Sequence, residues 1–91
     1  MATQEAEALN IDRSRIGTLE LEGMNVPYVD LEEEAFVPSN LRVGDSEYAY
    51  SRTFPIRGHS AVMPGAVSEV LAAGRTVLVA ERSERYYVYL A

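Results

Sequence analysis

The segment around the only histidine places a nucleophile beside a base. Gly58 to Val62 (GHSAV) matches part of the G-x-S-x-G pattern of a nucleophile elbow, but Val62 replaces the last glycine. A serine nucleophile also needs a histidine base that reaches it from elsewhere in the fold, and His59 is directly next to Ser60 in sequence. We therefore interpret this segment as a turn that leads into a helix.

Acidic side chains cluster around residue 32. Asp30, Glu32 and Glu34 share one face if the segment is a regular strand, and Glu33 faces the other way. Three carboxylates in a row are suitable ligands for a hard cation such as calcium. Their spacing matches no calcium loop, and no glycine allows the sharp bend. We interpret them as a solvated edge that discourages strand addition, and we predict no metal site.

Two residue types that often carry chemistry are missing. The chain has no cysteine, which excludes disulfides, thiolate metal sites and thiol catalysis. All eight basic residues are arginine, so Schiff-base chemistry on a lysine is also excluded. We predict that the protein is not an enzyme and needs no cofactor.

Tyrosines and arginines are frequent in the strand-like segments of the second half. Both residue types are common anchors of protein interfaces, and both also stack on the bases of single-stranded nucleic acid. The alternative is that the tyrosines lie across the sheet with their hydroxyls at its rim. We predict an interaction surface that comprises Tyr48, Tyr50, Arg52, Arg82, Arg85, Tyr87 and Tyr89. Regular alternation would place Tyr48, Tyr50 and Arg52 on one face.

Alternating and apolar runs predict the strands that carry these residues. The predicted strands cover residues 15–22, 26–31 with a continuation at 35–37, 41–43, 47–56, 76–80 and 86–90. Residues 81–85 form a polar loop of five residues between the last two. We predict an α+β fold with about five or six mainly antiparallel strands and one short helix packed on one face.

The helix is predicted at about residues 64–73. Pro64 suits a first helical position and Gly74 suits the residue just past the end. Val67, Val70 and Leu71 recur at helical spacing and give the apolar stripe that must pack on the sheet.

A chain of 91 residues holds one domain. We assign residues 13–91 to a single α+β domain and residues 1–12 to an N-terminal tail that is flexible or docks on a neighbour. No apolar run approaches the ~18 residues of a membrane span, and the acidic N-terminus lacks the pattern of a secretory signal. We therefore expect a cytoplasmic protein with no membrane partner.

The net charge of −6 is unevenly distributed. Residues 1–47 contain eleven acids and three arginines, and residues 48–91 contain three acids and five arginines. The acidic half does not suit contact with phosphate backbones, so nucleic acid is the less favoured partner. The difference between the halves indicates either a solvated surface or head-to-tail association, and we predict a homo-oligomer, either a dimer or a larger assembly.

Residues 67–90 run from the predicted helix through Gly74 to two strands joined by a polar loop (VSEVLAAGRTVLVAERSERYYVYL). This segment resembles part of the N-terminal domain of prevent-host-death type antitoxins, in which a short helix ends at a glycine and is followed by a β-hairpin. The resemblance implies a dimeric DNA-binding regulator.

The sequence thus leaves three functions open. The first is a non-catalytic oligomeric interaction module with a structural, scaffolding or regulatory role, which associates with itself or with a protein partner. The second is the antitoxin-like DNA-binding regulator. The third is a small-ligand binder or enzyme subunit with a site at a subunit interface.

Overall fold

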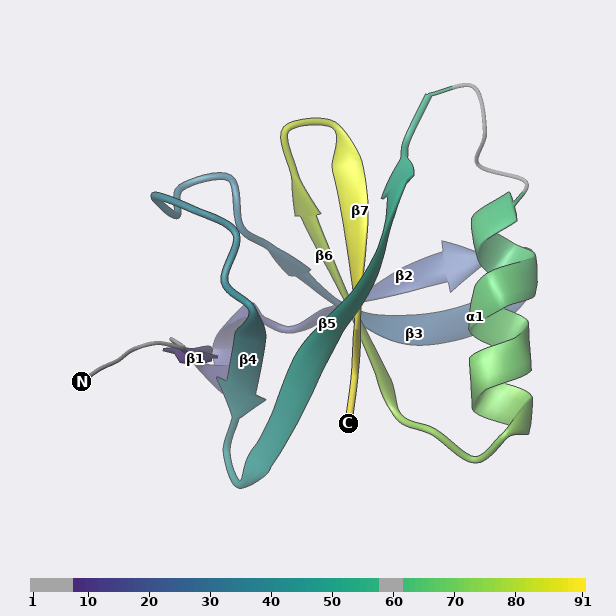
Figure 1. Ribbon diagram of the computed structural model, residues 1–91, viewed down its shortest axis with the longest axis horizontal. Coiled ribbons are helices and arrows are strands. Elements are labelled where there is room, and N and C mark those ends of the chain that lie inside the picture. The colour runs from purple at the N-terminus through teal and green to yellow at the C-terminus, as the bar shows by residue number, and fades with distance from the viewer. Residues whose placement is uncertain (1–7, 58–61) are drawn as a thin grey trace.

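A single mixed sheet forms the body of the protein. The computed structural model describes residues 8–57 and 62–91. In chain order the elements are β1 (Ala8–Asn10), the 3₁₀ turn η1 (Arg13–Arg15), β2 (Gly17–Leu21), β3 (Met24–Asp30), β4 (Asn40–Val43), β5 (Ser46–Pro55), α1 (Val62–Ala72), β6 (Val77–Arg82) and β7 (Arg85–Leu90). The strands lie in the order β1-β4-β5-β7-β6-β3-β2 (Figure 1).

The α+β class with one α-helix is confirmed for the described residues, whereas the predicted strand count and pairing were wrong. The sheet has seven strands and is mixed, because β1 pairs with β4 and β3 with β6 in parallel. The additional strand, β1, comes from residues that the sequence assigned to the tail. The expected continuation of β3 at residues 35–37 does not form, and this segment belongs to the β3–β4 loop.

The turns between antiparallel strands are tighter than the sequence indicated. Arg82 pairs with Arg85, so the predicted five-residue loop is a two-residue turn of Ser83 and Glu84. Both residues have positive φ, 55° and 62°. This is the conformation of a type I′ turn, whose twist matches that of a hairpin. The apolar pairing of β6 with β7 fixes the register and holds two non-glycine residues in the left-handed region.

Helix α1 spans Val62–Ala72, which confirms the predicted helix with its start shifted by two residues. Its end is set by Gly74, where φ is +84°. The Gly74 N–H donates to the Leu71 carbonyl at 2.9 Å, and the Arg75 N–H donates to the Val70 carbonyl at 3.1 Å. These two bonds are those of a Schellman motif. Among the described residues, no helix has the length and apolar character needed to cross a membrane.

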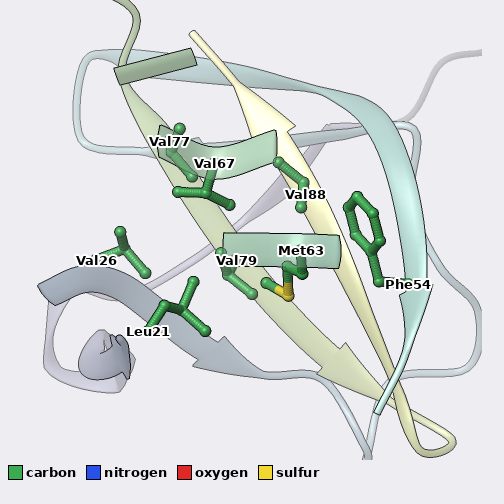
Figure 2. Close-up of a cluster of buried hydrophobic side chains, with 8 residues drawn as sticks. All are labelled: Leu21, Val26, Phe54, Met63, Val67, Val77, Val79 and Val88. Atoms are coloured by element: carbon green, nitrogen blue, oxygen red, sulfur yellow. The ribbon is translucent and has the colours of Figure 1, made fainter. Parts of the chain in front are cut away.

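Helix α1 covers one face of the sheet and seals the first core (Figure 2). This core consists of Leu21, Val26, Phe54, Met63, Val67, Val77, Val79 and Val88. Its side chains come from β2, β3, β5, β6 and β7 as well as from the helix. We call this side the helix face.

The opposite side of the sheet carries a second core, and we call it the second face. Its buried members are Ile11, Val29, Leu31, Leu41, Leu78, Ala80 and Tyr89. Helix α1 lies on the other face, and among the described residues the segment after β1, the β3–β4 loop and β4 contribute Ile11, Leu31 and Leu41 to this core. Ile11 is 4% exposed and its N–H donates to the Arg42 carbonyl at 2.8 Å. Residues 8–11, assigned to the tail from the sequence, are therefore part of the sheet and its core.

Candidate functional site

The predicted tyrosine surface lies mainly on the second face, and much of it is covered by the chain itself. Tyr89 is fully buried and its hydroxyl donates to the Pro38 carbonyl at 2.6 Å. The Tyr50 N–H donates to the Ser39 carbonyl at 2.9 Å, which fixes the same loop on β5. Burial raises the pKa of the Tyr89 phenol well above its usual value. Tyr89 is thus a core residue, and the prediction that it belongs to an interaction surface was wrong.

An exposed aromatic group remains beside Tyr89. Tyr50 is 45% exposed, and its ring centroid lies 6.0 Å from that of Tyr89 and 6.3 Å from that of the half-buried Tyr87. Phe36, in the β3–β4 loop, is 55% exposed. Phe36 is two residues before Pro38, whose carbonyl accepts the Tyr89 hydroxyl, so its loop is attached to the same side of the sheet. We call Phe36, Tyr50, Tyr87 and the exposed Arg85 the aromatic strip. Tyr48, also from the predicted set, is half-buried against the second core.

Arg52 does not lie with the tyrosines. The pairing of β5 with β7 slips between Tyr50, which is opposite Tyr89, and Arg52, which is opposite Val88. Ser51 is the extra residue of a β-bulge, and the bulge reverses the alternation of faces along β5. The Arg52 guanidinium therefore lies on the helix face, 4.8 Å from the centroid of the Phe54 ring. The expectation that Tyr48, Tyr50 and Arg52 share a face was wrong.

Arg82 has a structural role on the second face. Its guanidinium donates two hydrogen bonds to the Glu34 carbonyl, at 3.0 Å from Nη2 and 3.3 Å from Nε. These bonds attach the β3–β4 loop to β6. The Glu32 carboxylate accepts the Ser83 N–H at 3.0 Å, and Arg15 donates to the Asp30 carbonyl at 2.8 Å. The start of the β3–β4 loop is thus bonded to η1 on one side and to the β6–β7 turn on the other.

The two ion pairs among the described residues both lie within residues 1–47, the acidic half of the sequence. Arg15 forms an ion pair with Glu34 at 3.2 Å, and Arg42 forms one with Glu47 at 2.8 Å. Within residues 8–57 and 62–91, no three acidic or histidine side chains gather closely enough to hold a metal ion. The His59–Ser60 pair lies outside the described residues.

A polar cluster that the sequence did not single out lies on the helix face. The Tyr28 hydroxyl donates to the Glu81 carboxylate at 2.5 Å, between β3 and β6. Burial and this hydrogen bond raise the pKa of Tyr28, and burial together with the Glu81 charge raises the pKa of Tyr86. Tyr28 and Tyr86 therefore keep their protons at neutral pH, and the hydrogen bond joins β3 to β6.

A cavity of about 250 Å³ opens on the second face, at the end where η1 meets the β4–β5 hairpin. It is lined by Arg13, Ile16, Pro27, Val43, Tyr48 and Leu78. Of these residues the sequence singled out only Tyr48. The others come from five separate elements and connections, so no local pattern could have brought them together.

Comparison of the chain with protein-family models, with curated proteins and with solved structures finds no significant match.

Proposed function

We propose that this protein is a non-catalytic interaction module that pairs with a second copy of itself through the aromatic strip. The observation that carries the proposal is the exposure of Phe36 and Tyr50, 55% and 45%, on a firmly bonded part of the second face. Aromatic side chains are enriched at the buried centres of protein interfaces. Burial of these two against a partner would remove apolar surface from water.

The strip is held in place before any partner arrives. Arg82 holds the β3–β4 loop just before Phe36, and Tyr89 and Tyr50 hold it just after, at Pro38 and Ser39. A preformed surface loses little conformational entropy on binding. This arrangement supports recognition by rigid docking.

The charges beside the strip support a second copy as the partner. Arg85 is exposed next to the β6–β7 turn, and Glu33 is exposed on the loop that is bonded to this turn. Two copies related by a two-fold axis present the same patch to each other, so each arginine can face a carboxylate of the other copy. A partner that is only basic or only acidic at this surface would leave either Arg85 or Glu33 without an opposite charge.

The test is the mass of the full chain in solution. Light scattering and sedimentation from about 1 μM to about 1 mM should show a rise from the monomer mass toward twice that value. Phe36→Ser and Tyr50→Ser should each weaken the dimer at least tenfold, about 1.4 kcal/mol or more. Val62→Ser is the matched control, because Val62 is 54% exposed on α1.

A monomer mass of 10.1 kDa over this whole range would refute self-association. An equal effect of Val62→Ser would show that general apolar exposure, and not the strip, controls the mass. DNA binding stays a prediction from the resemblance of residues 67–90. A short DNA duplex added to the same samples tests it, and an increase in mass only with DNA would replace self-association with that function.

A further inference from the structure

We propose that the cavity between η1 and the β4–β5 hairpin binds a small organic anion with a compact apolar body, such as an aromatic monocarboxylate. This inference does not depend on self-association, because no residue of the aromatic strip lines the cavity. Small-ligand sites combine an apolar wall with a few polar groups that fix the orientation of the ligand.

The walls of the cavity are apolar and come from separate parts of the fold. Leu78 of β6 is buried, at 1% exposure, and belongs to the second core. Val43 and Tyr48 come from the β4–β5 hairpin, Ile16 is the residue before β2, and Pro27 belongs to β3. A volume of about 250 Å³ equals that of about eight water molecules. A single ring fits this space and a long lipid chain does not.

Arg13 gives the cavity its preference for an anion. Among the described residues that line the cavity, it is the only charged one. Within the described part of the chain, the Arg13 side chain makes no ion pair and no hydrogen bond. A guanidinium with its donors available matches the two oxygens of a carboxylate, and the Tyr48 phenol adds a second polar group.

Gly44 positions the guanidinium at the cavity. A Cβ atom built on Gly44 would lie 2.5 Å from Nη2 of Arg13, so the arginine lies over the bare backbone of the β4–β5 turn. The φ of Gly44 is +60°, which also favours glycine at this turn. The turn therefore brings the charged group to the edge of an apolar cavity.

Benzoate is the probe for this site, and benzamide is its uncharged counterpart of similar shape. Both are titrated into the full chain while backbone amide resonances are recorded. Benzoate should shift the Val43, Leu78 and Ile16 resonances in a saturable way, with benzamide at least tenfold weaker. Arg13→Gln should weaken benzoate binding at least tenfold. Arg13→Lys should weaken it less, because lysine keeps the positive charge but cannot donate two parallel hydrogen bonds to the carboxylate.

Arg42→Gln is the matched control. Arg42 is an exposed arginine on the adjacent β4, paired with Glu47, and does not line the cavity. It should leave the benzoate affinity within about twofold, because exposed charges outside the site are largely screened by salt. The proposal is overturned if benzoate causes no saturable shift at these residues up to about 10 mM. It is equally overturned if Arg13→Gln and Arg42→Gln weaken binding alike, or if benzamide binds as well as benzoate.

Discussion

Removal of one oxygen from the second core should reveal how strongly the β3–β4 loop is attached. Tyr89→Phe deletes the hydroxyl that donates to the Pro38 carbonyl at 2.6 Å, with both residues under 2% exposed. The ring still fills its space, so the main effect is a buried carbonyl that has lost this donor. Such a group costs about 1–3 kcal/mol. We expect a loss of about 2 kcal/mol, or roughly 10 °C in Tm for a chain of this size.

Tyr50→Phe is the control because the same oxygen is lost on the neighbouring strand. The Tyr50 hydroxyl bonds the Thr53 hydroxyl at 2.6 Å, but Tyr50 is 45% exposed and water can replace the bond. The expected loss is within about 0.5 kcal/mol. Urea unfolding of both variants measures the difference, with an unchanged m-value for each. Equal losses, or a neutral Tyr89→Phe, would refute the view that this bond secures the cover of the second face.

Two further predictions follow from backbone strain and from the buried phenols. Ser83→Asn combined with Glu84→Gly should stabilise the protein by about 1 kcal/mol, because both positions have positive φ and Asn-Gly suits a type I′ turn. A lower urea midpoint would contradict this. The pKa values of Tyr28 and Tyr89 are raised above the ordinary 10.0, so the unfolded chain loses these protons first. From neutral pH to about pH 9 the two phenols should leave stability unchanged, and above about pH 10 stability should fall, with a shallower fall in Tyr89→Phe. Urea unfolding at several alkaline pH values checks this, and a flat profile would exclude it.

The sequence predicted best where local physics decides the structure. Gly74 ends the helix because only glycine adopts positive φ there without cost, and this requirement can be read from the chain. The runs at β6 and β7 are apolar on both faces, and both faces are covered in the structure, by the first and second cores. Here the pattern and the tertiary environment agree.

The sequence failed where distant contacts decide. The bulge at Ser51 lies in a polar, alternating run, and only its pairing with β7 shows that one residue is extra. The resumed strand at residues 35–37 looked plausible, but hydrogen bonds from Arg82 and Tyr89 hold this segment as a loop. Tyr89 was expected in the interaction surface because no local pattern shows that this distant loop covers it.

The cavity and the aromatic strip share no residue, but both are in contact with the second core around Tyr89. Tyr48 lines the cavity and Tyr87 belongs to the aromatic strip, and both pack against the second core. Benzoate in the cavity and a second copy on the strip would therefore both contact residues that pack against one cluster. Because coupling between two sites is reciprocal, any change that benzoate causes in the dimer affinity must equal the change that dimerisation causes in the benzoate affinity. If benzoate leaves the dimer affinity unchanged, and dimerisation leaves the benzoate affinity unchanged, the second core is rigid enough to isolate the two sites.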